Sequence, residues 1–372
     1  MRNIFIGLCL VAFSLLTACR PKNNQGDITN AESEQYARGY KVVQKEGYRL
    51  VDIQDPQNTS SEVYRFALVP RGEKPEGVPA DYTVIEVPVR RVICMTSLQL
   101  SNFIKMGALD KVVGITSTRH LFNKEIKKQL KEGITRKIGI EGNFDAEVIM
   151  AANPDLIFIS PFKRGGYDTM KEIGIPLVPH LGYKETTPLG QAEWIKFIAL
   201  FTGQEGEANE KFQAIATRYN ELKKLTEGVK KRPVVFSGEL HGSNWYAVGG
   251  KSFLAQLFRD AGADYFLKND STSGGVTLDF ETVYAQAEDA DYWRILNSYK
   301  GDFTYDALKG VDPRYADFRA FRDKKVIYCN LGEKPFYESS TTEPEVVLED
   351  LIKAFHPQLL PDHQPKYYQL IK

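Results

Sequence analysis

The 372-residue chain lacks a net charge and is poor in cysteine. Lys and Arg together number 48, as do Asp and Glu, so no long-range field favours nucleic acid or an anionic membrane surface. The four cysteines include no CxxC pair and no cluster with metal-ligand spacing. Cys94 and Cys329 lie in apolar segments typical of strands, "RVICMT" and "KVIYCN". This setting favours two buried free thiols over a disulfide.

Several enzyme signatures are also missing. The chain has no GxSxG elbow and no HExxH pair. The segment "AVGGKS", from Ala247 to Ser252, resembles the end of a phosphate-binding P-loop, but the first glycine of that spacing is absent. An enzyme is therefore the weaker alternative for this sequence.

The N-terminus carries a short apolar run, "IFIGLCLVAFSLL", which follows "MRN" and is too short to span a bilayer comfortably. It ends in "LTAC", a small residue directly before Cys19. This looks like a bacterial lipoprotein signal, cleaved before Cys19 and lipidated on its sulfur. The alternative is a plain secretory peptide. We expect a signal peptide at 1–18 and a polar tether at 19–35.

The rest of the chain falls into four segments that differ in their sequence pattern. The chain is long enough to form two lobes that each bury a hydrophobic core. Residues 36–90 read as a β-rich N-terminal annex. Strands and helices alternate over 91–187 and again over 231–372, whereas 188–230 holds only helical periodicity. Such alternation predicts an α/β fold of two lobes, each a mostly parallel sheet flanked by helices, joined by a long helix.

One phrase occurs in both lobes. Asp145 precedes "AEVIMAA" and Asp279 precedes "FETVYAQA", so each aspartate is placed to cap a helix N-terminus. Glu147 and Glu281 then fall on the second helical position, where a negative charge suits the helix dipole. On this basis alone the two glutamates are either favourable first-turn residues or a matched functional pair.

Together these features resemble the substrate-binding lipoproteins of ABC importers that handle vitamin B12, ferric siderophores and haem, the class III periplasmic binding proteins. The resemblance covers most of the chain after Arg90 and is carried by "RVICMTSLQLSNFIKMGALDKVVGIT", "FDAEVIMAANPDLIFIS", "WYAVGGKSFLAQLFRDAGADYF" and "LDFETVYAQAEDADYW". It implies that Glu147 and Glu281 dock into arginine pockets of the permease, one per lobe.

The resemblance also implies a partner set: an ABC permease with its ATPase, a small-molecule metal chelate, and the membrane through the lipid on Cys19. No nucleic acid, resident metal or tightly bound cofactor is expected, and the protein is expected to be a monomer. The protein would be anchored in the cell envelope facing the periplasm. A stiff helical bridge would allow only slight closure of the lobes around ligand.

Ligands of parallel α/β sheets gather beyond the carboxyl ends of the strands, where this chain is rich in aromatic and basic residues. Aromatic rings offer flat contact area, and cations balance carboxylates or phosphates. The predicted ligand-binding residues are Ser97, Arg119, His120, Lys163, Arg164, His180, Tyr183, His241, Trp245, Tyr246, Tyr299 and Tyr337.

Other ligands and roles remain open from the sequence. His120, His180 and His241 could instead hold a bare divalent metal or ligate the metal of a haem or corrinoid, although each alone is typical of an ordinary polar residue. The alternative function is therefore a haem or free divalent-metal binder of the same fold. A weaker alternative is a surface interaction lipoprotein without a small-molecule site.

Overall fold

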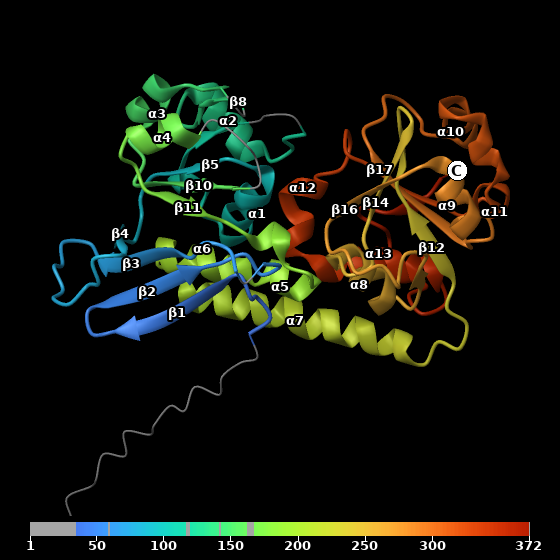
Figure 1. Cartoon of the computed structure of the whole chain (residues 1–372), viewed down its shortest axis with the longest axis horizontal. Helices are drawn as coiled ribbons and strands as arrows, with labels where there is room; N and C mark the ends of the chain where they lie inside the picture. Colours follow the sequence, from blue (N-terminus) through green and yellow to red (C-terminus); the bar gives the residue numbers. More distant parts are fainter. Residues whose placement is uncertain (1–34, 59, 117–119, 141–142, 162–166, 372) are drawn as a thin grey trace, which may run out of the picture. The chain divides into compact units, whose positions relative to one another are not determined.

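The computed structural model describes residues 35–58, 60–116, 120–140, 143–161 and 167–371, with the side chains of residues 168 and 169 left aside. The predicted signal peptide, most of the tether and four predicted site residues (Cys19, Arg119, Lys163 and Arg164) lie outside these ranges. Residues Met1–Gln35 and Tyr36–Lys372 are separate units, and the fold below is that of the second (Figure 1).

A four-stranded sheet opens this unit, in the order β1 (Tyr40–Lys45), β2 (Tyr48–Ile53), β3 (Tyr64–Pro70) and β4 (Thr83–Val87). The first three strands are antiparallel, and β4 runs parallel to β3. Gly47 turns the β1–β2 hairpin at φ +79°, a left-handed conformation that glycine adopts without a Cβ penalty. The backbone N–H of Val89 bonds the carbonyl of Phe201 at 2.7 Å, which ties the sheet's exit to the helical bridge.

The N-terminal lobe is built on a five-stranded parallel sheet in the order β11-β10-β5-β6-β7. The strands are β5 (Val92–Cys94), β6 (Val112–Ile115), β7 (Arg136–Lys137), β10 (Leu156–Ile159) and β11 (Leu177–Pro179). Its helices are α1 (Ser97–Met106), α2 (Lys124–Glu132), α3 (Ala146–Ala152) and α4 (Tyr167–Glu172), with a short ribbon of β8 (Gly139–Ile140) and β9 (Asn143–Phe144).

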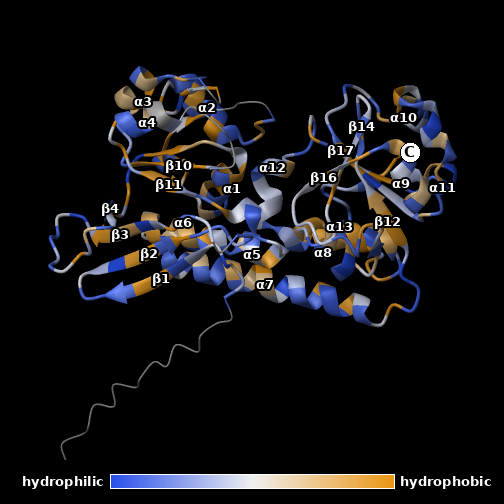
Figure 2. Cartoon of the chain, in the orientation of Figure 1, coloured by the Kyte–Doolittle hydropathy of each residue, from blue (hydrophilic) through white to orange (hydrophobic). Residues whose placement is uncertain are grey.

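Alternate strand residues of this sheet enter two different cores. Val92 and Cys94 share a core with Phe103 of α1, whereas Ile93 packs with Ile149 of α3. Both faces of the sheet are therefore covered, which is why its central strands read as continuous apolar runs rather than as alternating ones. Figure 2 shows these strands as hydrophobic.

The helical bridge consists of α5 (Pro188–Ala192), α6 (Trp194–Thr202) and α7 (Glu205–Glu227), after a short turn at Gly182–Lys184. Gly203 ends α6 in the left-handed conformation, at φ +74°. The long helix α7 has 23 residues, about 34 Å at 1.5 Å per residue. Its apolar residues at helical spacing are buried as predicted, while most of its exposed side chains are polar, with Leu225 as an exception (Figure 2).

The C-terminal lobe has the sheet order β15-β12-β17-β18-β19, parallel except for the edge strand β19. These strands are β12 (Val234–Ser237), β15 (Asp264–Tyr265), β17 (Tyr292–Asn297), β18 (Val326–Asn330) and β19 (Gln369–Leu370). A second sheet joins β13 (Glu239–His241), β14 (Asn244–Val248) and β16 (Gly275–Leu278). The helices are α8 (Phe253–Asp260), α9 (Phe280–Ala287), α10 (Tyr305–Val311), α11 (Arg319–Arg322), α12 (Phe336–Ser339) and α13 (Pro344–Phe355).

The two lobes repeat one topology. Their central strands have the orders β6-β5-β10-β11 and β15-β12-β17-β18, and in each lobe these strands follow the chain order second, first, third, fourth. The predicted α/β class with two lobes and a long joining helix is thus confirmed. The repeated phrase forms α3 and α9, the helices that lead into the third strand of each lobe.

Two further sequence expectations can be compared with the described residues. Cys94 and Cys329 are both free and buried, as predicted. Within the part of the chain that the model describes, no helix has the length and apolar character needed to cross a membrane.

Candidate functional site

A cavity of about 240 Å³ is lined by residues of both lobes and of the bridge. Helix α1 contributes Leu98, the turn before α5 contributes Tyr183, and α5 itself contributes Gln191. The C-terminal lobe contributes residues of β14, α8, β17, α12 and α13, among them Phe253 and Tyr337. The lining is mostly apolar and aromatic, as is usual for small-molecule sites.

Strand β17 contributes a positively charged residue, Arg294, to the lining of this cavity. Successive strand residues point to opposite faces, so Arg294 and Leu296 line the cavity while the intervening Ile295 is buried in the core. The Nε atom of Arg294 donates to the hydroxyl of Tyr368 at 2.9 Å, and Nη2 also donates to that hydroxyl. The guanidinium carbon lies 5.1 Å from the centroid of the Tyr368 ring. Arg294 is half-buried.

Two of the predicted ligand-binding residues, Tyr183 and Tyr337, line the cavity. Ser97 begins α1 beside Leu98 but does not line it. His120, with φ +57°, has its Nε2 atom 3.2 Å from the Ser298 hydroxyl, a contact between the two lobes.

His180 is a core residue, so its predicted ligand role is wrong for this structure. Its side chain is 4% exposed and packs on Trp194, with ring centroids 4.6 Å apart. Burial lowers the pKa of His180 to about 3, so the ring is neutral near pH 7. His180 does follow the end of β11, as predicted, but its side chain packs on the bridge and does not line the cavity.

Trp245 must be corrected in the same way. The segment "HGSNWYAVGG" holds the turn and second strand of the β13–β14 hairpin, and of its residues Val248, not Trp245, lines the cavity. Trp245 is 0% exposed, and its indole N–H donates to the carbonyl of Ser237 at 3.0 Å. It stacks on Trp293, with centroids 5.7 Å apart, so it belongs to the aromatic core of the C-terminal lobe.

The remaining predicted residues do not line the cavity either. His241 and Tyr246 lie on the hairpin, with exposed side chains and rings 5.5 Å apart. Tyr299 packs against Phe303, with centroids 5.1 Å apart. His120, His180 and His241 form no common site, and the described residues hold no group of three His, Cys, Asp or Glu side chains suited to a metal.

Among the predicted ligand-binding residues only Tyr183 and Tyr337 line the cavity, and Arg294 with its partner Tyr368 is the most telling omission. The available signal was the arginine inside "DYWRIL", a charge in the middle of a segment that otherwise reads as a buried strand. Arginine is rarely fully buried unless it is paired. Such a charge in a central strand is therefore a candidate for function.

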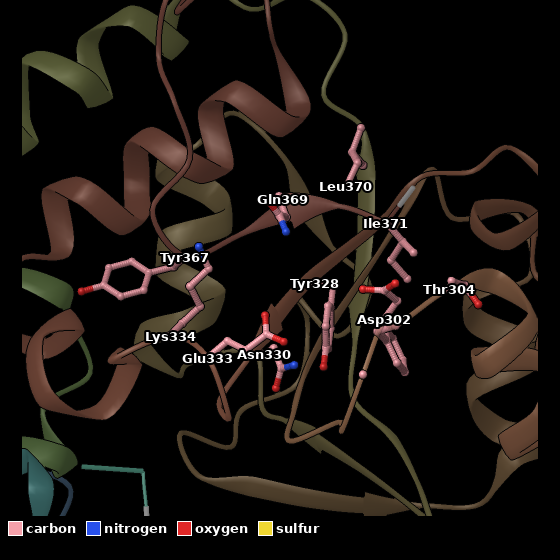
Figure 3. Close-up of a pocket in the computed structure, with 12 residues that line it drawn as sticks. Asp302, Thr304, Tyr328, Asn330, Glu333, Lys334, Tyr367, Gln369, Leu370 and Ile371 are labelled. Atoms are coloured by element: carbon pink, nitrogen blue, oxygen red, sulfur yellow. The ribbon is translucent and has the colours of Figure 1, made fainter. Parts of the chain in front are cut away.

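A second cavity, of about 330 Å³, lies within the C-terminal lobe beside β18 and β19 (Figure 3). The polar side chains that the buried strand β18 contributes to it already have hydrogen-bond partners within the lobe. The Tyr328 hydroxyl donates to Asn297 Oδ1 at 3.0 Å, and Asn330 Nδ2 donates to the Tyr299 carbonyl at 2.9 Å. Because only one lobe lines it, this cavity is the poorer candidate for a ligand site.

Helix α12 follows the last parallel strand of the C-terminal lobe but contacts the N-terminal lobe. The two carboxylate oxygens of Glu338 accept the backbone N–H groups of Phe122, at 2.6 Å, and of Asn123, at 2.9 Å. Beyond α12, the hydroxyl oxygens of Thr341 and Ser101 are 3.0 Å apart. Tyr337 and Thr341 also line the cavity, so one segment joins the lobes and the candidate site.

The two glutamates of the repeated phrase are exposed at equivalent places. Each is the second residue of its helix, after a capping aspartate. Asp145 accepts the N–H of Val148 at 3.0 Å. Asp279 accepts the N–H of Thr282 at 2.6 Å. The predicted capping is confirmed.

The surroundings of these glutamates differ. The carboxylate of Glu281, which is 78% exposed, lies 3.4 Å from Nη1 of Arg314. That arginine is itself held by Asp312 at 2.8 Å. No ion pair joins Glu147 to another described residue.

Comparison with known proteins identifies the family. The model of the periplasmic binding protein family matches residues 92–330, well over half of the chain. The chain belongs to the periplasmic binding protein family.

Relatives of this periplasmic binding protein include the uncharacterized lipoprotein MJ0878 of Methanocaldococcus jannaschii. It is 24% identical, over 97% of this chain and 94% of the relative. Among solved structures, a periplasmic haem-binding protein from Pseudomonas aeruginosa superposes with a TM-score of 0.59 at 18% identity, covering 76% of this chain and 98% of that one. An Fe³⁺-hydroxamate transport protein from Saccharomonospora viridis gives a TM-score of 0.56 at 21% identity, covering 72% and 94%. At these identities the structural likeness establishes the fold alone.

Proposed function

We propose that this periplasmic binding protein is the solute-binding component of an ABC importer. It captures a chelated metal compound, a ferric siderophore or a corrinoid, between its lobes and delivers it to the permease. The observation that carries the proposal is the cavity lined from both lobes and the bridge. Two of the similar structures are named for haem binding and for Fe³⁺-hydroxamate transport, which supports this class of cargo.

The chemistry of the lining favours a chelate over a bare metal ion. Among the residues that the structure describes, the lining includes no histidine, cysteine, aspartate or glutamate, the side chains that hold divalent ions in proteins. Instead, aromatic and aliphatic side chains offer flat apolar contact, as an organic chelator needs. Haem remains the second candidate because tyrosines such as Tyr183 and Tyr337 line the cavity.

At about 240 Å³ the cavity is just smaller than the roughly 300–1,000 Å³ of typical ligand sites. We therefore expect it to hold part of a chelate, with the rest of the cargo in the cleft between the lobes. The exposed Glu147 and Glu281 would dock with arginines of the permease, in charge-assisted contacts that set the register of each lobe. The lipid on Cys19 would keep the protein at a membrane that faces the periplasm.

Native mass spectrometry of the purified protein tests the proposal. The protein is incubated with haemin, a ferric trihydroxamate, ferric citrate, a ferric tricatecholate, cobalamin and divalent metal salts. We expect one chelate to bind without being chemically changed and to stabilise the fold, by about 2.7 kcal/mol when its free concentration is a hundred times Kd. If no chelate binds, the proposed cargo is wrong.

A further inference from the structure

Arg294 places a positive charge on the cavity wall. The other described residues that line it include no lysine, aspartate or glutamate. Among the described residues, no carboxylate oxygen lies within 4.0 Å of its guanidinium, and its side-chain bonds go to the neutral hydroxyl of Tyr368. The carboxylate of Glu239 interacts with Arg294 electrostatically, without a direct ion pair. Its Oε2 atom instead accepts a hydrogen bond from Asn297 Nδ2 at 2.8 Å.

A half-buried charge without a counter-ion is costly, because part of its hydration is lost and neutral groups replace it only incompletely. Elsewhere this chain pairs such arginines. Arg71, with 28% of its side chain exposed, lies 3.0 Å from Glu86. Arg232 lies 3.0 Å from Asp264. Arg294 is thus an exception that faces the candidate ligand site.

We infer that Arg294 is the counter-ion site for an acidic group on the cargo, so that the ligand is an anionic chelate rather than a neutral one. The guanidinium has five N–H donors in a fixed plane, and the Tyr368 hydroxyl occupies the edge formed by Nε and Nη2. The remaining donors suit a carboxylate or a similar oxyanion. This inference rests on the proposed function and narrows its substrate class.

The surrounding side chains indicate what else that ligand carries. Phe253, Phe336 and Tyr337 line the same cavity and present rings. Rings of this kind favour a flat or aromatic body. The expected ligand therefore joins an acidic group to an apolar or aromatic framework. Haem with its propionates has this chemistry, and so does a catecholate or carboxylate ferric chelate.

A matched pair of probes tests the charge directly. Haemin and its dimethyl ester differ only in their two acid groups. By equilibrium titration we expect the wild-type protein to bind haemin at least about tenfold more tightly than the ester, since charge-assisted hydrogen bonds contribute about 1.5–3 kcal/mol. Arg294→Gln should weaken haemin binding by a similar factor and leave ester binding unchanged.

The control is Arg259→Gln, which removes a positive charge from the exposed face of α8, outside the cavity. It should leave both affinities unchanged. The variant Tyr368→Phe distinguishes a structural role of Arg294, which would be to hold Tyr368, from its role as counter-ion. This variant removes the hydroxyl and keeps the charge of Arg294. We expect Tyr368→Phe to retain the preference for acid over ester. Equal losses in both variants, or a preference for acid that survives in Arg294→Gln, would overturn the inference.

If the wild-type protein does not bind haemin, the same comparison is made with the anionic tricatecholate and citrate complexes against the neutral trihydroxamate and cobalamin. Binding of an anionic chelate that is weakened about tenfold in Arg294→Gln supports the inference. Binding of neutral chelates alone overturns it and leaves the proposed function standing. Binding of no chelate removes the proposed function and the inference together.

Discussion

At the scale of single residues, the capping aspartates explain why the chain repeats a phrase. Asp145 and Asp279 each accept an N–H from the first turn of a short helix, which stabilises a helix end that has no intrahelical partner. A second pair of aspartates, Asp155 and Asp291, is also structurally equivalent in the two lobes. Each accepts a backbone N–H near the first strand of its lobe, from Arg91 at 3.0 Å and from Val234 at 2.9 Å. Asp155 follows Asp145 by 10 positions whereas Asp291 follows Asp279 by 12, so the repeat is only approximate in sequence.

His180 provides a prediction at this scale. Burial lowers the pKa of His180 from 6.5 to about 3, so between these pH values the unfolded state binds a proton that the folded state does not. Its contribution to stability is therefore present above pH 6.5 and is lost as pH falls, by about 1.4 kcal/mol per pH unit. His180→Phe keeps a ring against Trp194 and removes the titration.

Chemical denaturation of both proteins between pH 7.5 and pH 4.5 gives the measurement. The free energy of unfolding of the wild type, minus that of His180→Phe, should fall as the pH is lowered through 6.5. Subtracting the free energy of unfolding of the variant cancels the opposite pH dependence that buried carboxyls give to both proteins. Glu185 is one such carboxyl, because burial raises its pKa. A difference that stays flat with pH would show that folding does not lower the pKa of His180.

At the scale of elements, much of the fold follows from the sequence, and the placement of side chains does not. Apolar runs bounded by turn residues predict β5, β10, β12 and β18, and helical spacing predicts α7, because these signals are local. Trp245 was misplaced because a hairpin flanked by glycines reads like a loop. Its burial depends on β16, which joins the hairpin from about 30 residues further along the chain. The role of Arg294 likewise depends on which side of β17 faces the cavity.

Helix α12 gives the element-scale prediction. Glu338 satisfies two backbone N–H groups at the start of α2, and its side chain is buried. Glu338→Ala should leave both donors unpaired and destabilise the protein by about 1–3 kcal/mol. Hydrogen exchange should speed up at Phe122 and Asn123. The matched control is Glu333→Ala, an exposed glutamate five positions earlier, for which we expect no change at either amide. Unchanged exchange in Glu338→Ala would mean that α12 does not hold the N-terminal lobe.

At the scale of the whole molecule, docking and cargo binding should be separable. Glu147 and Glu281 lie outside the cavity lining and are exposed. Replacing both with Ala should leave the affinity for the chelate unchanged and abolish uptake, because each lobe would lose its proposed charge-assisted contact with the permease. Uptake is measured in vesicles that hold the cognate permease and ATPase, and affinity by titration of the same protein. The control replaces Asp110 and Asp306, one exposed acid in each lobe. Uptake that survives in the double glutamate variant would refute the docking assignment.

The lobes should close only slightly on the cargo, because two separate connections restrain them. One is the bridge, with the 23-residue α7. The other is the α12 segment, which bonds the N-terminal lobe through Glu338 and Thr341. A hinge motion would have to break partly buried hydrogen bonds as well as bend a long helix. We therefore expect the small-angle scattering profiles of the unliganded and the chelate-loaded protein to coincide closely.

The same measurement on Glu338→Ala tests the cause. If α12 supplies part of the restraint, the variant should contract more on binding than the wild type does. Equal, small changes in both proteins would assign the restraint to the bridge alone. A marked contraction of the wild-type protein would contradict the rigid arrangement, since neither connection could then be holding the lobes in place.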